Sequence, residues 1–313
     1  MTCETCHVEC KKFGRDRKGH QRFRCRHCFR TITEPHNGHF FSMYTPAEKA
    51  VLILKMFVEG VSVRSIERLT GVHRDTILSL LVLSGDHSER LLEDRIRQHS
   101  VNDVQYDEIW GFVGCKEKKN KTGNPMMGDA YCFVAIERNT KLVIAWHLGR
   151  RTARDTVAFT EKINEATQGE FQITTDGFRP YVDAVQYSLG TRVDFAQLIK
   201  VYSTPREGEQ RYSPAEVVDA VPVPQWGNPN LDRICTSHVE RQNLSIRMGM
   251  RRMTRLTNAF SKKWENLKAA YALWFAFYNF CRVHQTLRVT PAMEAGIADH
   301  VWAVHELLTA AVG

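Results

Sequence analysis

The sequence lacks the features that would mark a secreted or membrane protein. No positively charged stretch followed by an apolar run opens the chain, so no secretory signal is expected. The longest apolar stretch, residues 269–278, is about half as long as a membrane-spanning helix and predicts a buried helix instead. Internal repeats and low-complexity segments are also lacking. We therefore expect an intracellular protein with no membrane partner.

A disulfide framework is not indicated either. Four of the nine cysteines are scattered, and the other five crowd into the first 28 residues: Cys3, Cys6, Cys10, Cys25 and Cys28. The pairs Cys3-x-x-Cys6 and Cys25-x-x-Cys28, 18 residues apart, supply the four thiolates that tetrahedral Zn²⁺ requires. Cys10 and nearby histidines leave the ligand assignment open. We predict a zinc ribbon at residues 1–33, because so small a unit needs a metal to stay folded.

Acidic residues are absent from one long stretch. Residues 241–263 carry seven Lys or Arg and no Asp or Glu, and residues 1–40 carry nine against four. These stretches hold +7 and +5 of a net charge of +8, which leaves the rest of the chain at −4. Cations gathered in this way favour a polyanionic partner such as DNA over a uniformly solvated surface. In the ribbon, Arg22 and Arg24 are candidate DNA contacts.

A helix-turn-helix pattern follows a linker at residues 34–44. Residues 47–59 form an amphipathic pattern, Ser62 can cap a second helix, and Gly71 can make the turn into a third. The residues expected to pack these helices together are Ile66, Leu69, Val72 and Ile77. The exposed start of the third helix, with His73, Arg74 and Thr76, would enter the major groove of DNA. We assign residues 45–99 to a DNA-binding domain, with an ordinary helical hairpin as the alternative.

From residue 100 the pattern is that of an α/β domain. Strands are predicted at residues 104–113, 130–137, 142–148 and 171–175, with a helix at 153–166 before the last of them. This order suits a mixed sheet with flanking helices. Residues 203–233, with five prolines, indicate an insertion or long loop. Helices are expected at 237–263 and 264–282, and a helical tail at 291–313.

Acidic residues on these elements are candidates for a metal site. Asp107 lies in the first strand, Asp176 ends the fourth, and Glu240 is on a later helix. Asp107 and Glu108 are neighbours on a strand, so at most one is expected to line a site. Competing carboxylates are Asp129, Glu137 and Asp183. Three converging carboxylates would bind Mg²⁺ or Mn²⁺ and serve phosphodiester cleavage.

The helix of Glu240 also carries a basic stripe. Asn243 and Arg247 follow at three and seven positions, which places them on the same face, and Arg251 is expected to continue the row. Together with Arg252 they are candidate DNA contacts. A carboxylate at the head of such a stripe is expected where metal and DNA backbone meet on one helix.

These residues resemble the insertion-sequence-one family of transposases, over nearly the whole chain. The most specific pieces are residues 19–28 (GHQRFRCRHC), 106–110 (YDEIW), 175–177 (TDG), 238–243 (HVERQN), 251–262 (RRMTRLTNAFSK), and the stretch from Tyr278-Asn279 to Thr290-Pro291. The resemblance implies a ribonuclease-H-like catalytic domain, here residues 100–290. It also implies an Asp, Asp, Glu triad at Asp107, Asp176 and Glu240, and it alone selects Asp107 over Glu108. The 63 residues between Asp176 and Glu240 exceed the spacing in compact members, which the insertion at 203–233 would explain.

The function expected from these features is DNA transposition in a prokaryotic cytoplasm, at the nucleoid. The N-terminal units would bind terminal inverted repeats, and metal-activated water would free a 3′ hydroxyl that attacks target DNA. Handling two ends together implies a homodimer or larger assembly on DNA. Two alternatives stay open: a sequence-specific regulator that has lost catalysis, and a structure-selective nuclease without strand transfer.

Overall fold

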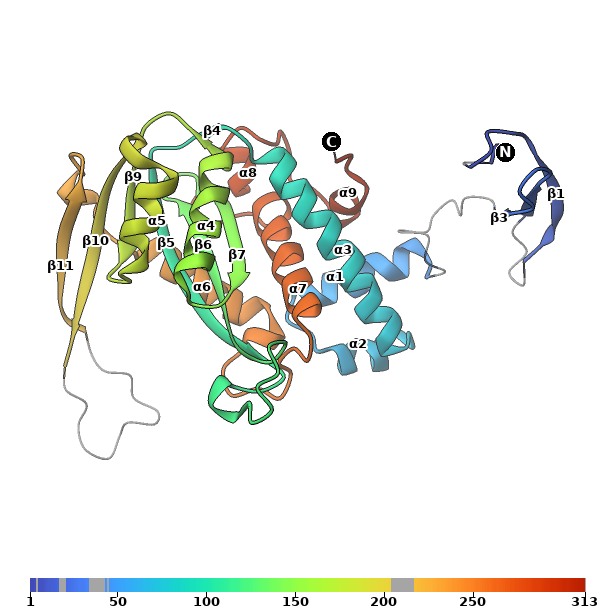
Figure 1. The fold of residues 1–313 in the computed structure, drawn as a ribbon, viewed down its shortest axis with the longest axis horizontal. Helices are drawn as coiled ribbons and strands as arrows, with labels where there is room; N and C mark the ends of the chain where they lie inside the picture. The colour runs from blue at the N-terminus through green and yellow to red at the C-terminus, as the bar shows by residue number, and fades with distance from the viewer. Residues whose placement is uncertain (4, 17–20, 34–42, 44, 204–216, 313) are drawn as a thin grey trace. The chain divides into compact units, whose positions relative to one another are not determined.

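The computed structural model describes residues 1–3, 5–16, 21–33, 43, 45–203 and 217–312 (Figure 1). They fall into two compact units, Met1–Leu52 and Ile53–Gly313. Most of the predicted linker at 34–44 lies outside the described residues. Within the described part of the chain, no helix is both long enough and apolar enough to cross a membrane.

The first unit contains a small antiparallel sheet. Its strands are β1 (Cys10–Arg15), β2 (Gln21–Cys25) and β3 (Thr31–Thr33), in that order. The pairing of β1 with β2 sets Cys10 opposite Cys25. The core beneath this sheet is formed by buried Cys3, Cys10 and Cys25, with Phe23 and Ile32 packed against them. Cysteines thus occupy the positions that aliphatic side chains fill in a larger domain.

The three predicted helices follow as α1 (Ala47–Val58), α2 (Val63–Thr70) and α3 (Arg74–Arg95). Ser62 caps α2 by accepting a hydrogen bond from the backbone N–H of Ser65, and Gly71 ends it with φ at 68°. Both boundaries are where the sequence predicts them. Ile66 and Ile77 are fully buried, but Leu69 is 68% exposed, so its predicted packing role is wrong.

The central element of the second unit is a mixed six-stranded sheet in the order β11-β10-β9-β5-β6-β7. Its strands are β5 (Asp103–Val113), β6 (Gly128–Glu137), β7 (Val143–Gly149), β9 (Phe171–Asp176), β10 (Val193–Tyr202) and β11 (Val217–Trp226). β5 runs parallel to β9 and antiparallel to β6, and β9 runs parallel to β10. The two-residue strands β4 (His99–Ser100) and β8 (Thr167–Gln168) form a separate pair. The predicted α/β class with a mixed sheet is confirmed.

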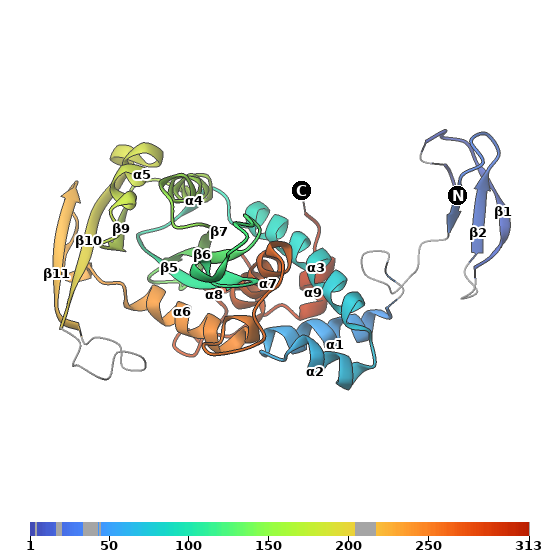
Figure 2. The same ribbon diagram turned by 60° about the horizontal axis from the view of Figure 1, so that its bottom comes forward.

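Helices cover both faces of this sheet (Figures 1 and 2). On one face, α4 (Ala153–Ala166) and α5 (Pro180–Ser188) pack through Phe159 and Tyr181 against Tyr106 of β5, with ring centroids 5.4 and 5.9 Å apart. On the other face lie α6 (Ser237–Gly249), over β5, and α7 (Trp264–Ala276). Figures 1 and 2 show α7 between β7 and α3. The π-helix η6 (Phe277–Cys281) extends α7, and α8 (Pro291–Glu294) and α9 (Val304–Thr309) complete the chain.

Two predictions for the region after Asp176 are wrong. The sequence predicts an insertion or a long loop at residues 203–233; residues 204–216 lie outside the described residues, but the remainder contains β11, which pairs antiparallel with β10, so the long-loop alternative is wrong there. Pro222 and Pro224 argue against a strand in the sequence, because proline cannot donate a backbone hydrogen bond. β11 lies at the edge of the sheet, where proline is tolerated. The helix expected at 237–263 ends at Gly249, and only the short 3₁₀ turn η5 (Arg251–Met253) follows.

Close contact between α3 and α7 supplies a stability test. A Cβ added at Gly85 of α3 would lie 2.4 Å from the Cα of Ala269 on α7. Alanine favours an isolated helix over glycine by about 1 kcal/mol, but here the helices must move apart. We expect Gly85→Ala to lower the free energy of unfolding by about 1–3 kcal/mol in urea denaturation, as overpacking does. The neighbouring exposed change Asp86→Ala should stay within about 0.5 kcal/mol, and a stabilised Gly85→Ala protein would contradict this packing.

Candidate metal centres

The first candidate site is the predicted cysteine cluster. One Sγ atom from each of Cys3, Cys6, Cys25 and Cys28 lies within 4.8 Å of the others, and Cys3 and Cys28 are 3.6 Å apart. Thiolates bound tetrahedrally to zinc at about 2.3 Å are separated by about 4 Å, so the four side chains fit this ion. Cys10 is not a member of the cluster: it is buried beside it, with its Sγ 3.9 Å from the carbonyl oxygen of Val8.

Two similar turns bring these cysteines together. The N–H of Cys3 donates to the carbonyl of Val8 and that of Cys25 to the carbonyl of Arg30, each five residues on and at 2.9 Å. Backbone N–H groups of Cys28 and His27 also point at the Cys25 sulfur and lower the pKa of that thiol to about 6. The turn therefore favours the thiolate, which is the form that binds metal.

Cations and aromatic rings lie side by side on the sheet of this unit. The guanidinium of Arg24 is 4.9 Å from the ring centroid of Phe13 and 5.5 Å from that of Phe29, and Arg22 is 5.5 Å from Phe13. Phe13 and Phe29 are 38% and 62% exposed. The predicted contact residues Arg22 and Arg24 thus belong to an exposed cation–aromatic surface; their DNA contact stays a prediction.

The second candidate site lies where β9 ends against β5. The parallel register sets Tyr106 beside Thr175, so Asp107 and Asp176 come next on adjacent strands. Carboxylate oxygens of Asp107, Glu108 and Asp176 lie within 4.8 Å of one another. The structure therefore brings two of the predicted residues together and adds a third that the sequence did not select.

Asp107 and Glu108 both approach Asp176, contrary to the prediction that at most one of them belongs to the site, although only Asp107 lines the cavity. β5 continues to Val113, but β9 stops at Asp176. Beyond that point no β9 backbone separates the two faces on this side of β5, so side chains that leave β5 in opposite directions can both reach Asp176. Glu108 comes from the α5 side, near Tyr181, and Asp107 from the α6 side, near Asn243.

Like charges at this strand end shift the titration of two carboxyl groups. Burial, then the charge of Asp176, raises the pKa of Asp107 to about 7, and Glu240 adds to the effect. Burial and Asp176 also raise the pKa of Glu108 to about 7, although Arg151 opposes this. The Glu108 side chain is 3% exposed. The buried Tyr181 hydroxyl is close enough to lower the pKa of this carboxyl, but among the described residues Oε1 receives no hydrogen bond of good geometry. A cation would relieve both the repulsion and the unpaired oxygen.

Neighbouring groups hold the carboxylates in place. Asn243 of α6 donates from Nδ2 to Asp107 Oδ2 at 2.8 Å, and the N–H of Phe178 donates to Asp176 Oδ1 at 3.0 Å. Arg151 lies 3.3 Å from Glu108 Oε2 and 3.9 Å from Asp176 Oδ2. The sequence indicated Asn243 as a neighbour of Glu240 but gave no sign of Arg151, which reaches the site from the start of α4.

Glu240 lines the same cavity, of about 690 Å³, as Asp107 and Asp176. Its Oε1 accepts hydrogen bonds from Lys200 Nζ of β10 and from Thr236 Oγ1. Gln105, two residues before Asp107, anchors this end of α6 by accepting the N–H groups of His238 and Val239 at 2.9 and 3.3 Å. Glu240 is therefore beside the three clustered carboxylates but not one of them.

The competing acids lie elsewhere. Glu137 is buried and accepts hydrogen bonds from the turn at Asn139 and Thr140. Asp129 accepts the N–H of Glu117 at 3.0 Å, and Asp183 is exposed on α5. None of the three lines the cavity beside Asp107.

Two of the basic residues after Glu240 donate hydrogen bonds to backbone carbonyls, whereas Arg251 is exposed. Arg247 donates to the carbonyls of Met253 and Trp110, at 3.1 and 3.0 Å. Arg252 donates to Ser261 Oγ and the carbonyl of Asn266. Burial lowers its pKa to about 10. Both guanidinium groups thus hold backbone segments in place, and their DNA contact stays a prediction.

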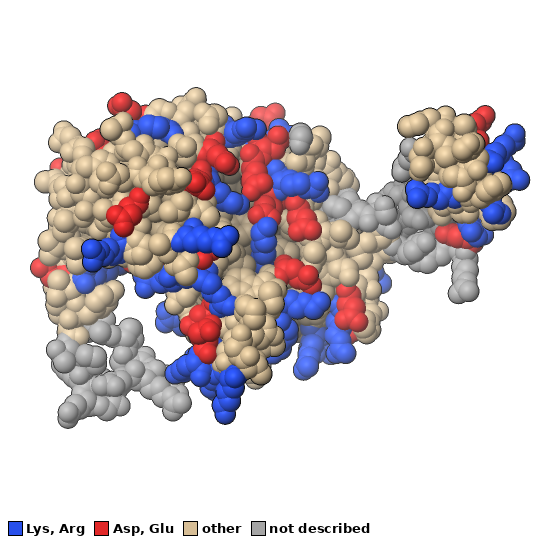
Figure 3. All heavy atoms as spheres, viewed as in Figure 1, with Lys and Arg blue, Asp and Glu red and all other residues tan. Residues whose placement is uncertain are grey.

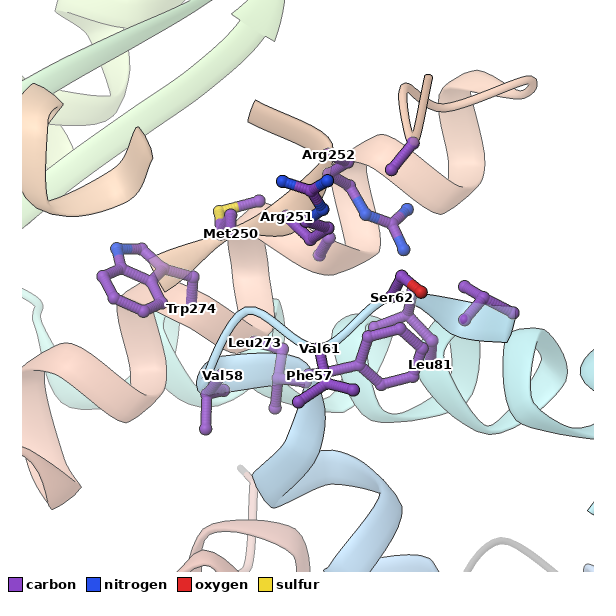
Figure 4. A pocket seen from close by; sticks show the side chains of 13 residues that line it. Phe57, Val58, Val61, Ser62, Leu81, Met250, Arg251, Arg252, Leu273 and Trp274 are labelled. Carbon is purple, nitrogen blue, oxygen red and sulfur yellow. The ribbon is translucent and has the colours of Figure 1, made fainter. Parts of the chain in front are cut away.

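Arg251 is exposed, but its predicted place in the helical row is wrong, since α6 ends before it. Figure 4 shows Arg251 and Arg252 beside the corner between α1 and α2, around a cavity of about 30 Å³. Arg252 lies 5.8 Å from the ring centroid of Phe57. The segment after α6 therefore packs on the turn that leads into the second helix of the predicted helix-turn-helix.

At the start of α3, His73 and Arg74 are exposed and Thr76 is half-buried. His73 Nδ1 caps the helix by accepting the N–H of Asp75, at 3.3 Å. A further group of cations, missed in the sequence, lies in the loop between β5 and β6 around η2 (Glu117–Lys119) (Figure 3). Its lysines are Lys116, Lys118, Lys119 and Lys121.

Comparisons with known proteins give little. No family model and no curated protein matches the chain. Among solved structures, the chain is similar to the piggyBac transposase synaptic complex with hairpin DNA, with a TM-score of 0.37 and 12% identity. The match covers 84% of this chain and 70% of that one. At this level of similarity the match carries no weight for function, which has to be argued from the two sites.

The cysteine cluster predicts the zinc content of the protein. We expect one zinc ion per chain by elemental analysis, and loss of that zinc in Cys25→Ser, because a thiolate ligand is removed. Cys10→Ser is the matched control, since Cys10 is buried beside the cluster but outside it. Zinc retained in Cys25→Ser, or lost in Cys10→Ser, would contradict the assignment.

The carboxylate cluster predicts a pH dependence of stability in Mg²⁺-free protein. The pKa values of Asp107 and Glu108, about 7, lie above the ordinary values of 3.8 and 4.5. The stability that these groups contribute is therefore present at low pH and is lost as pH rises towards about 7. In Asp107→Asn, urea denaturation should show a smaller loss between about pH 4 and pH 8 than in the wild type. Parallel curves for the two proteins would refute these shifts.

Proposed function

We propose that the protein is a DNA transposase whose catalytic centre is the carboxylate cavity at the end of β9. The observation that carries the proposal is the convergence of Asp107, Glu108 and Asp176 within 4.8 Å, with Glu240 lining the same cavity. Buried carboxylates that repel one another are costly for a fold, so they indicate a function that uses a cation.

The arrangement of the sheet supports a ribonuclease-H-like catalytic domain at residues 100–290. Counted from β5, the sheet has three antiparallel strands in sequence and a fourth, β9, that returns parallel to the first. This order puts the first and fourth strands side by side, as expected for a catalytic pair at Asp107 and Asp176. Catalytic acids from these strands and from a helix would then share one cavity.

Carboxylate oxygens are the ligands that Mg²⁺ and Mn²⁺ prefer. Asp107, Asp176 and Glu108 would hold such an ion, and Glu240 lines the same cavity as Asp107 and Asp176. When bound, divalent cations stabilise both the attacking and the leaving oxygen of a phosphodiester during in-line displacement. The fit rests on the unpaired Oε1 of Glu108 and on the raised pKa values of two carboxyls.

The chain's own residues position these ligands. Asn243 fixes one oxygen of Asp107, and the Phe178 N–H fixes one of Asp176. Lys200 and Thr236 hold Glu240. Cations beside the acids also reduce the repulsion between the cavity and a DNA backbone.

The N-terminal segments supply the proposed DNA recognition. In this proposal, the zinc ribbon at 1–33 and the helix-turn-helix at 45–99 bind terminal inverted repeats through Arg22, Arg24, His73, Arg74 and Thr76. The catalytic domain frees a 3′ hydroxyl at the element's end and joins it to target DNA. Two copies of the chain, one for each end, act at the nucleoid of a prokaryotic cell.

The test uses labelled DNA from the sequences that flank the gene, together with a target plasmid and Mg²⁺ or Mn²⁺. We expect wild-type protein to give cleaved and joined products. Asp107→Asn and Asp176→Asn should each lose more than about 100-fold, because they remove ligands of the divalent cation. Glu240→Gln should also lose activity, because it removes the carboxylate that lines the cavity beside them. Asn243→Ala should lose about 10–100-fold, because it removes only the support of a ligand.

Asp183→Asn, which changes an exposed carboxylate outside the cavity, is the control and should keep full activity. Cleavage without joining would favour a structure-selective nuclease. Specific binding of the flanking DNA without any metal-dependent product would favour a regulator that has lost catalysis. An active Asp176→Asn protein would overturn the catalytic centre itself.

A further inference from the structure

A second cavity, of about 520 Å³, lies on the other flank of α6, and its lining is cationic. Three side chains with permanent positive charge and two imidazoles contribute to it: Lys141, Arg241, Arg282, His238 and His284. No Asp or Glu belongs to the lining. Arg282 and His284 come from the stretch after Tyr278-Asn279, which the sequence analysis singled out and the catalytic cavity does not use.

The helix itself separates the two cavities. Val239 and Ile246 are fully buried and mark the side of α6 that faces the sheet. Glu240 and Asn243 lie on one flank of this side, towards Asp107. His238, Arg241 and Ser245, at spacings of three and four, lie on the other flank and line the second cavity. One helix thus carries carboxylate chemistry on one flank and positive charge on the other.

Segments around η6 complete the cavity wall. Asn279 exchanges two hydrogen bonds with the backbone of Val143 on β7, the last strand of the sheet, at 2.9 and 3.0 Å, and Tyr278 Oη donates to the carbonyl of Lys141. These bonds fix the beginning of the segment that carries Arg282 and His284. The positive groups are therefore set in place by structure and do not sit on a free loop.

Only part of the positive charge in this cavity is offset by a nearby carboxylate, because the buried Glu137 acts on Lys141 and His238. Among the described residues, neither Arg241 nor Arg282 forms an ion pair with a carboxylate, and Lys141 donates to the carbonyl of Arg138. Burial, Lys141 and Arg138 lower the pKa of His238 to about 4, although the buried Glu137 opposes this. Gln242, 2% exposed, lines the cavity, and its Nε2 has no hydrogen-bond partner in the described part of the chain.

We propose that this cavity binds a backbone phosphate of the DNA strand that passes over α6 to the carboxylate cavity. The proposal rests on the proposed function in one respect, that DNA is the ligand. An α-helix with its side chains is about 10 Å across, and phosphates along one strand are spaced at about 3.4 Å of helix axis. A strand crossing α6 would therefore place two phosphates that are only a few nucleotides apart in the two cavities. The cationic cavity would then determine which phosphodiester bond lies at the carboxylates.

The salt dependence of DNA binding tests the proposal. The full-length, zinc-loaded protein is titrated with a short DNA duplex at several salt concentrations, without Mg²⁺ or Mn²⁺, so that no cleavage intervenes. Each phosphate contact contributes about 0.9 to the slope of log Kobs against log salt concentration. The double change Arg241→Ala and Arg282→Ala should make the slope shallower by about 0.9 or more.

Two further variants serve as controls, one for loss of the fold and one for nonspecific effects of charge. Gln285→Glu introduces a carboxylate at the cavity with almost no change of shape, and should weaken DNA binding while the unfolding curve stays unchanged. Arg154→Ala removes an exposed arginine from α4, on the other face of the sheet from α6 and outside both cavities, and should leave the slope unchanged.

Each outcome supports or overturns the proposal. A slope that becomes shallower only in the double variant supports the proposal. This holds even if the cleavage assay shows no products; in that case the proposed transposition fails, but DNA binding at the cavity stands. Equal slopes in the wild type and the double variant overturn it, whether or not the protein cleaves DNA. Inorganic phosphate that shifts the His238 NMR signals, with unchanged DNA slopes, overturns it in favour of a free-anion site.

Discussion

The repulsion among carboxylates at the end of β9 is the constraint on which the rest of the second unit depends. The parallel pairing of β5 with β9 places Asp107 and Asp176 next to each other, and Glu108 joins them because β9 stops there. Burial makes this arrangement unfavourable for three negative charges. Arg151 and Asn243 act on the cluster from different elements, one through charge and one through a hydrogen bond. The site is thus assembled from the sheet and from helices on both of its faces.

Helix α6 presents two flanks whose positions are fixed relative to this carboxylate cluster. Gln105 of β5 anchors its first turn, so the helix that carries Asn243 is tied to the strand that carries Asp107. Its far end is fixed by Arg247, which donates to backbone carbonyls of β5 and of η5. Held at both ends, α6 keeps its two flanks at a constant orientation to the carboxylates. This rigidity makes it suitable for positioning a polyanion relative to the site.

The N-terminal unit is stabilised in a different way. Its core contains three buried cysteines and few apolar side chains, so hydrophobic burial contributes little to its stability. The fit of four sulfurs to a tetrahedral ion suggests that coordination replaces the missing core. Arginines over exposed phenylalanine rings then remain on its surface, available to a partner that offers both charge and flat rings, as nucleic acids do.

The sequence by itself determined the local features: the paired cysteines, the caps at Ser62 and Gly71, and the strands that carry Asp107 and Asp176. These depend on residue type and spacing within a short stretch, which periodicity and turn chemistry reveal. Only the tertiary structure decided which side chains share the carboxylate cavity. Glu108 joins the cluster because a neighbouring strand ends, Arg151 arrives from α4, and β11 forms at a sheet edge in spite of its prolines. Arg247 and Arg252 turn inward for the same reason: the backbone carbonyls of Trp110 and Asn266 lie within their reach, and no local pattern in the sequence records that proximity.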